Sequence, residues 1–258
     1  MSDGGVIGEL ARGLAARRGV ISAWVTVNDA AVADALAREP FDAVTLDLQH
    51  GDVDFVGATR AIVAVALAGK PTIVRVPVGD FALASRLADA GAAAVIAPMI
   101  DDEESARRFA EFMKFPPLGR RSWGPRAAAA LSGLAGADYL NGADAMTLAI
   151  AMIETREALD ALDAILATPG IDGLFVGPYD LSVALHRGAF IDPDSAEVDA
   201  ALTRVVARAA AHGKFAGLFC ADGARAKRAL ARGFAFCTVS SDLDLLRAAA
   251  RRELAAAR

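Results

Sequence analysis

Polar side chains that could carry out proton transfer follow one apolar stretch directly. In AVTLDLQHGD, residues 43–52, Asp47, Gln49 and His50 lie within four positions, and the chain has only three histidines. A carboxylate beside an imidazole orients the ring and raises its basicity. Asp47 and His50 would point to opposite faces of a continuous strand, but a turn at Gly51 relieves that constraint. We therefore predict His50 as a catalytic base with Asp47 beside it; the alternative is a loop histidine without chemical function.

Two carboxylates follow later apolar stretches. Glu154 ends MTLAIAMIE, and Asp180 ends GLFVGPYD one strand–helix unit further on. Adjacent parallel strands lie about 4.8 Å apart, so the two carboxylates should converge, and converging carboxylates repel unless a proton or a cation lies between them. Oxygen ligands without a nearby His or Cys suit Mg²⁺ or Mn²⁺. We predict a metal site here; the alternative is that each acid only caps the following helix.

Arg75 is the charged residue in PTIVRVP, an otherwise apolar stretch at residues 71–77. Burying an arginine without a partner is costly, and two interpretations remain open. One is an interior ion pair with Asp47. The other is an arginine that faces a bound anion and stabilises negative charge on its oxygen.

Short apolar stretches recur along the chain, separated by alanine-rich helical patterns. Near-continuous apolar stretches are typical of parallel strands covered on both faces. We expect strands at 20–27, 42–48, 71–77, 92–100, 146–154, 173–178, 215–220 and 234–240. Eight strand–helix units in 258 residues predict an α/β fold, a single (β/α)8 TIM barrel over residues 1–258. A doubly wound open sheet is the alternative, although no G-x-G-x-x-G follows the first strand.

The candidate residues all fall at the ends of predicted strands, and active sites of such barrels lie at the C-terminal strand ends. Two other segments are expected in subunit contacts. One is the connection 115–145, predicted as a long loop because of its Pro, Gly and Arg content, and the other is the C-terminal helix 241–257.

Composition argues against several classes of partner. The net charge is -5, with 27 basic and 32 acidic residues, whereas a nucleic-acid partner usually requires a strong basic patch. No apolar run reaches the roughly 18 residues of a membrane span, and the first residues lack a signal-peptide pattern, so we expect a cytoplasmic protein without a membrane partner. Cys220 and Cys237 are expected to be buried, reduced thiols. His186 and His212 are weaker candidates than His50, since His212 ends a helix pattern before glycine.

Five motifs occur together in one order: DLQHG (47–51), VRVP (74–77), APMI (97–100), IETREAL (153–159) and VGPYDLS (176–182). With them the chain resembles, over nearly its whole length, the HpcH/HpaI aldolase family, metal-dependent class II pyruvate aldolases such as those acting on 4-hydroxy-2-oxoheptanedioate. The resemblance implies a barrel of the phosphoenolpyruvate/pyruvate type, commonly a homo-hexamer with helix exchange between subunits. It also implies a divalent cation, Mg²⁺, Mn²⁺ or Co²⁺, and a 2-oxo acid and an aldehyde as small-molecule partners.

The resemblance assigns roles to the residues already singled out. Glu154 and Asp180 match the metal-binding carboxylates of the family. His50 matches its base, Asp47 the acid beside that base, and Arg75 the arginine that stabilises the enolate.

Two further residues receive roles through the resemblance alone. Asp89, in RLADAG, matches an acid that supports the basicity of the histidine. It should end a helix just before the fourth strand, so it could reach a barrel mouth only in a neighbouring subunit; a surface acid is the alternative. Tyr179, through its backbone N–H, joins Arg75 and Asp180 as an expected substrate-binding residue.

The implied function is reversible cleavage of a 4-hydroxy-2-oxo acid, through a metal-stabilised enolate, to an aldehyde and pyruvate or a related 2-oxo acid such as hydroxypyruvate. Lys70 and Lys214 precede strands and do not end them, which disfavours a Schiff-base lysine. Gln49 stands where many members have Glu, and Met152 where well-known members have a substrate-contacting Gln, so the preferred substrate stays open. The main alternative is an acyl-CoA lyase of the citrate/malyl-CoA lyase type; an isomerase or decarboxylase using the same enolate and a silent binding protein are others.

Overall fold

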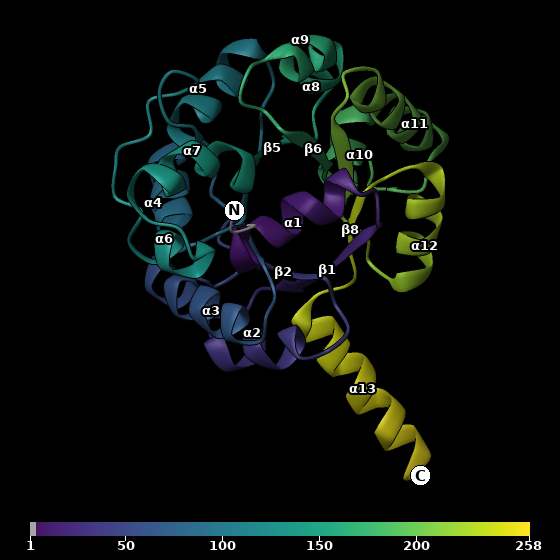
Figure 1. Ribbon diagram of the computed structural model, residues 1–258. Helices are drawn as coiled ribbons and strands as arrows, with labels where there is room; N and C mark the ends of the chain where they lie inside the picture. Colours follow the sequence, from purple (N-terminus) through teal and green to yellow (C-terminus); the bar gives the residue numbers. More distant parts are fainter. Residues whose placement is uncertain (1–3) are drawn as a thin grey trace.

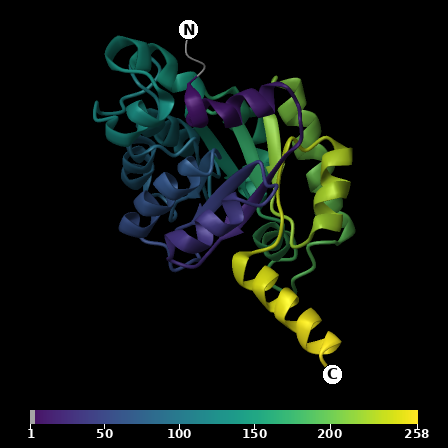
Figure 2. The same ribbon diagram turned by 60° about the horizontal axis from the view of Figure 1, so that its bottom comes forward.

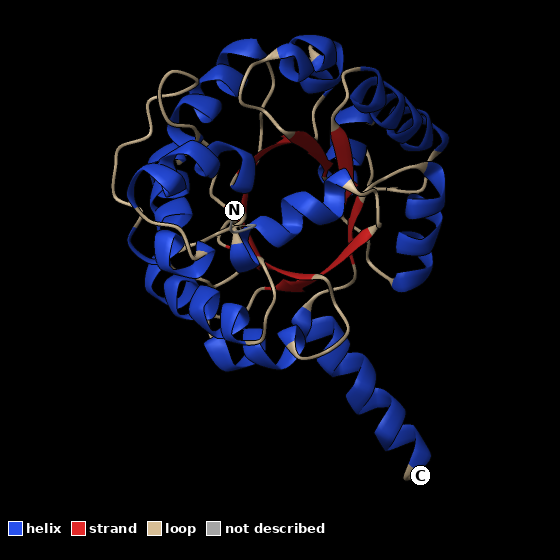
Figure 3. Cartoon of the chain, in the orientation of Figure 1, coloured by secondary structure: helices blue, strands red, loops and turns tan. Residues whose placement is uncertain are grey.

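The computed structural model describes residues 4–258, and its strands form a closed parallel barrel (Figure 1, Figure 3). Residues 1–3, which belong to the segment examined for a signal peptide, lie outside the described part. The strands are β1 (Val20–Val25), β2 (Ala43–Asp47), β3 (Thr72–Arg75), β4 (Ala94–Ala97), β5 (Leu148–Ile153), β6 (Gly173–Val176), β7 (Phe215–Leu218) and β8 (Phe236–Thr238). Each strand pairs with the next, and β8 closes the ring by pairing with β1. The predicted TIM barrel is confirmed, and the open sheet is excluded.

The strands are buried on both faces, which explains their near-continuous apolar sequences. One apolar cluster fills the barrel and includes Trp24, Ile73, Ile150 and Phe175. A second cluster lies between the strands and the surrounding helices. Cys220 and Cys237 belong to this outer layer as buried free thiols, as predicted.

Helices surround the barrel: α2 (Ala30–Ala37), α3 (Phe55–Leu67), α4 (Phe81–Ala90), α5 (Glu103–Met113), α8 (Arg156–Asp160), α9 (Leu162–Ala167), α10 (Pro178–Leu185), α11 (Ala196–Ala211) and α12 (Gly223–Arg232). Many of them begin at an aspartate whose carboxylate accepts a backbone N–H of the first turn, which is a favourable N-cap. Asp29, Asp54, Asp80, Asp102 and Asp222 act in this way.

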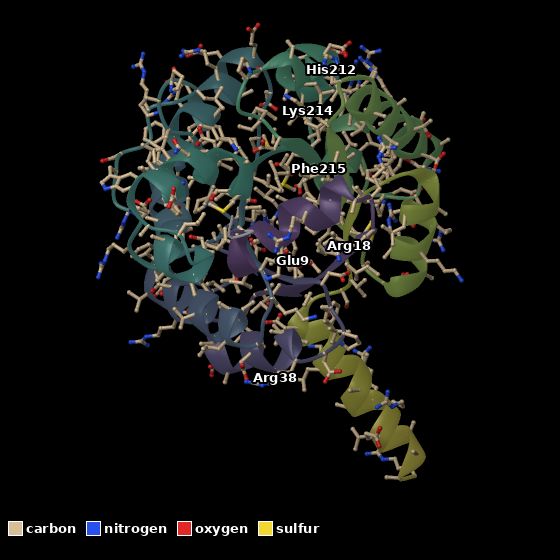
Figure 4. All side chains as sticks on the ribbon, viewed as in Figure 1. Glu9, Arg18, Arg38, His212, Lys214 and Phe215 are labelled. Atoms are coloured by element: carbon tan, nitrogen blue, oxygen red, sulfur yellow. The ribbon has the colours of Figure 1, made fainter. Side chains whose placement is uncertain are left out.

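The N-terminal end of the barrel is closed by α1 (Gly5–Ala15), which crosses in front of the strands in Figure 1. It buries Ile7, Leu10 and Leu14 in the interior cluster. Glu9 and Arg18 form an ion pair, with 2.7 Å between Oε1 and Nη2, on the exposed side of this cover (Figure 4). The opposite end, where the strands terminate, is therefore the open mouth.

The connection 115–145 is not the single long loop that was predicted. It contains α6 (Arg126–Ser132) and α7 (Gly136–Met146). These helices bury Ala128, Tyr139 and Ala143 in the same cluster as α1. Packing of an apolar face stabilises helices too short to form alone, and this contribution outweighs the Pro- and Gly-rich composition on which the prediction depended.

The C-terminal helix α13 (Asp242–Ala256) was predicted to within one residue at each end, and it projects away from the barrel (Figure 2). Its buried residue is Asp242, whose carboxylate accepts hydrogen bonds from the backbone N–H of Thr26 at 3.0 Å and of Val27 at 2.9 Å. Leu246 and Leu254 are 66% and 57% exposed. The helix is thus anchored at its first turn, with apolar side chains uncovered beyond it.

Within residues 4–258, no helix combines the length and the apolar character that a membrane crossing requires.

Candidate active site

The central feature of the mouth is a buried ion pair between β2 and β3. Register places Asp47 beside Arg75. The guanidinium donates to both carboxylate oxygens, with 2.9 Å from Nε to Oδ1 and 2.6 Å from Nη2 to Oδ2. The guanidinium also lies over the ring of Trp24, 4.9 Å from its centroid, and the indole N–H donates to Asp47 at 3.3 Å. Of the two interpretations of Arg75, the structure therefore shows the interior ion pair with Asp47.

His50 lies exposed directly after this pair. Asp47 Oδ1 accepts the backbone N–H groups of Gln49 at 3.1 Å and His50 at 3.3 Å. The carboxylate thus holds the backbone of His50 through its N–H group, whereas the sequence predicted it beside the imidazole. Gly51 permits the turn, since a Cβ there would lie 2.4 Å from the Asp47 carbonyl oxygen.

Glu154 is a buried carboxylate at the end of β5, with 2% of its surface exposed. Its Oε1 accepts the backbone N–H of Met99 at 2.9 Å. Met99 has a φ of 54°, in the left-handed region that non-glycine residues rarely adopt. Burial, the largest effect, raises the pKa of Glu154 to about 7; the Met99 N–H opposes this shift, and the negative charge of Asp180 adds to it.

Asp180 and Tyr179 lie in the first turn of α10, beside Glu154. The helix begins after Gly177 with Pro178 at its first position. A Cβ on Gly177 would lie 2.8 Å from Glu154 Oε2 and 2.5 Å from the terminal methyl of Met152. Glycine therefore lets the backbone before α10 approach the buried carboxylate. Asp180 is close enough for its negative charge to raise the pKa of Glu154, as the predicted convergence of the two carboxylates requires.

The donor set fits a hard divalent cation. Glu154 is buried beside a second carboxylate, and the nearby guanidinium of Arg75 is already paired with Asp47. A buried charge without a counter-charge is costly, and carboxylate oxygens are the ligands that Mg²⁺ and Mn²⁺ prefer. Residues 4–258 contain no group of three or more His, Cys, Asp or Glu side chains arranged around one point. Glu154 and Asp180 are the two carboxylates that would hold such a cation.

Metal-free protein should lose stability as the pH rises from about 4.5 to 7. The folded pKa of Glu154 is about 7 and its ordinary value is 4.5, so in this range the folded state binds more protons than the unfolded state and the free energy of unfolding falls with pH. The full loss is about 3 kcal/mol. Urea unfolding in EDTA at several pH values measures it. Glu154→Gln should flatten this dependence, and an unchanged slope in that variant would exclude Glu154 as its source.

The site residues lie at strand ends on the same side of the barrel. β2, which precedes His50, lies opposite β6, which precedes Asp180, in the order of strands around the ring. Arg75 and Glu154 lie on intervening strand ends. The arrangement combines a cation site, a fixed positive charge and a solvent-accessible imidazole, which together can stabilise negative charge on a bound oxygen and move a proton nearby.

Other candidates lie away from this constellation. Asp89 ends α4, near the barrel end opposite the mouth, and pairs with Arg121 at 2.7 Å. His186 stacks on Phe190, with 4.0 Å between ring centroids. His212 Nε2 contacts Asp163 at 3.1 Å at the outer edge of the molecule, and Lys214 precedes β7 nearby (Figure 4).

Sequence reasoning assigned no role to Trp24, Met99 or Gly177. Trp24 could have been suspected as a large aromatic residue in an inward-facing strand position. Met99 lies in the APMI motif, but its contribution is a backbone N–H, which no side-chain pattern reveals.

The fold is a (β/α)8 barrel, and the comparisons place the chain among enzymes of the aldolase and lyase class. Residues 21–249 match the HpcH/HpaI aldolase/citrate lyase family. The chain belongs to this family.

Individual relatives match over almost the whole chain. A hydroxypyruvate/pyruvate aldolase of Rhizorhabdus wittichii is 41% identical over 241 residues, which cover 93% of this chain and 95% of that protein. A 5-keto-4-deoxy-D-glucarate aldolase of Shigella dysenteriae is 32% identical over 240 residues, covering 93% and 92%. The crystal structure of a family protein from Burkholderia cenocepacia superposes with a TM-score of 0.88 at 31% identity, covering 97% of this chain and 99% of that one.

Proposed function

We propose that this protein is a divalent-metal-dependent 2-oxo acid aldolase. It reversibly cleaves a 4-hydroxy-2-oxo acid to an aldehyde and pyruvate, or a related 2-oxo acid such as hydroxypyruvate. The observation that carries the proposal is the buried Glu154 carboxylate, whose pKa is raised to about 7 beside Asp180 and Arg75. The names of the relatives, which include hydroxypyruvate/pyruvate aldolase, support the same reaction class.

Glu154 and Asp180 are the proposed ligands of the cation, with Mg²⁺, Mn²⁺ and Co²⁺ as candidates. When bound, the cation supplies Lewis-acid stabilisation of negative charge on the 2-oxo acid. Arg75, held in place by Asp47, adds a fixed positive charge for the keto oxygen as the enolate develops. The Tyr179 N–H, in the first turn of α10, is the proposed donor to the substrate carboxylate.

His50 is the proposed general base. In the cleavage direction it takes the proton of the 4-hydroxyl group as the carbon–carbon bond breaks, and in condensation it returns that proton to the aldehyde oxygen. Because the imidazole is exposed, a water molecule can relay this proton. Asp47 contributes by fixing the backbone of His50.

A pyruvate-release assay on a panel of 4-hydroxy-2-oxo acids tests the proposal. We expect activity with added Mg²⁺, Mn²⁺ or Co²⁺ and a loss of at least about 100-fold after complete chelation. His50→Ala should lower cleavage by about 100-fold, with His212→Ala as a matched control on the protein surface. Activity that survives chelation would refute the metal site, and full activity in His50→Ala would refute the base.

The acyl-CoA lyase of the citrate/malyl-CoA type is the less favoured alternative, because the named relatives above are aldolases. Cleavage of a CoA ester without cleavage of any oxo acid in the same panel would favour it.

The proposed assembly is a homo-oligomer, a hexamer by family expectation. The uncovered leucines of α13 supply an apolar face for subunit contact. Asp89 would take part in catalysis only if such an assembly brought it to the mouth of a neighbouring barrel. The cytoplasmic location stays a prediction from the sequence.

A further inference from the structure

Three aromatic side chains form a series from the barrel interior to the rim of the mouth. Trp24 is buried in β1, stacks on Phe175 at 6.0 Å between centroids and lies beneath Arg75. Phe219, just after β7, contacts the Trp24 ring edge-on at 5.3 Å and 83°. Tyr179, in the first turn of α10, contacts Phe219 edge-on at 6.2 Å and 69°. The series therefore links the Arg75 ion pair with the helix that carries Asp180.

Exposure increases along this series. Trp24 is buried, Phe219 is partly buried against the barrel interior cluster, and Tyr179 is 41% exposed. Edge-to-face contacts fix the orientation of aromatic rings. The Tyr179 ring is thus an apolar surface with a fixed orientation at the rim of the mouth, and it lies next in sequence to Asp180, a proposed cation ligand.

The charges of the mouth favour a neutral second substrate. Carboxylates follow the strands β2, β4, β5 and β6 at or just after their ends: Asp47, Asp101, Glu154 and Asp180. Arg75 is the basic residue within the eight described strands, and its Nε and Nη2 already donate to Asp47. Once a 2-oxo acid has bound near Arg75 and the cation, the described strands supply no second guanidinium or ammonium for an additional carboxylate.

Resting on the proposed aldolase function, we propose that Tyr179, supported by Phe219, determines specificity for the aldehyde. It selects neutral aldehydes with an aryl or alkyl substituent over aldehydes that carry a carboxylate. The substituent packs against the exposed Tyr179 ring, while the aldehyde oxygen points across the mouth towards His50. Tyr179 contributes apolar surface, so its hydroxyl is dispensable.

Competition between aldehydes in condensation with pyruvate tests this assignment. Benzaldehyde, succinic semialdehyde and formaldehyde are compared as acceptors by their kcat/KM values at saturating Mg²⁺. The wild type should prefer benzaldehyde to succinic semialdehyde. Tyr179→Ala should lower the benzaldehyde-to-formaldehyde ratio about tenfold, and Tyr179→Phe should retain it. Phe190→Ala removes another exposed aromatic ring, one that stacks on His186, and should leave the ratio unchanged.

Three outcomes would overturn the inference: a wild-type preference for succinic semialdehyde, an unchanged ratio in Tyr179→Ala, or an equal change in Phe190→Ala. Tyr179→Leu, which keeps apolar bulk, gives a second variant, and an intermediate ratio supports the packing role. Deuterium exchange into the methyl group of pyruvate separates this inference from the proposed function. If deuterium exchange occurs but Tyr179→Ala leaves the benzaldehyde-to-formaldehyde ratio unchanged, only the role of Tyr179 is refuted. If the wild type shows neither metal-dependent exchange nor cleavage, the proposed aldolase function is refuted.

Discussion

Glu154→Gln should lower the turnover of oxo-acid cleavage by at least about 1,000-fold at saturating Mg²⁺. The amide keeps the shape of the side chain and can still accept the Met99 N–H, but it carries no negative charge to balance a divalent cation. The affinity for Mn²⁺, measured by electron paramagnetic resonance, should fall with turnover. Parallel losses of metal affinity and turnover would identify Glu154 as a ligand.

Glu157→Gln is the matched control, since it makes the same chemical change three residues later, on the exposed first turn of α8. It should retain both turnover and Mn²⁺ affinity. Unfolding of the variant would not explain the loss of activity. The uncharged amide removes the cost of burying a negative charge, the same cost that raises the pKa of Glu154. Metal-free Glu154→Gln should therefore be at least as stable as the wild type at pH 8, and wild-type Mn²⁺ affinity in this variant would contradict the ligand assignment.

The barrel and the location of the site could be predicted because both follow from local sequence. Strands buried on both faces require near-continuous apolar stretches, and a parallel barrel brings all C-terminal strand ends to one mouth. Asp47, Arg75 and Glu154 were therefore placed at the mouth by their position in the stretches alone. The pairing of Asp47 with Arg75 was foreseen as one of two interpretations, because adjacent strands in register bring them together.

Features that depend on tertiary geometry could not be predicted from the apolar stretches of the sequence. The N–H of Met99 reaches Glu154 only because its backbone adopts a φ of 54°, and no glycine marks that turn. The helices α6 and α7 form because they cover the barrel interior beside α1. The hydrogen bond from the His50 backbone N–H to Asp47 depends on how the chain turns after β2, which residue spacing alone does not reveal.

The buried ion pair gives the second large effect. Arg75→Met keeps much of the side-chain volume but leaves the Asp47 carboxylate buried without its charged partner. Breaking one partner of a buried pair costs about 3–5 kcal/mol, although the Trp24 N–H and two backbone N–H groups still donate to Asp47. Urea unfolding should therefore detect a clear loss of stability, with pyruvate release lowered about 100- to 1,000-fold at the same time.

The double variant Asp47→Asn/Arg75→Met separates stability from catalysis. Removing both charges should recover most of the free energy of unfolding, because a neutral pair leaves no unpaired charge in the interior. Turnover should stay low, since the positive charge for the enolate is still missing, whereas Mn²⁺ affinity should persist through Glu154 and Asp180. If the double variant regained turnover along with stability, Arg75 would be a structural partner of Asp47 and not the group that stabilises the enolate.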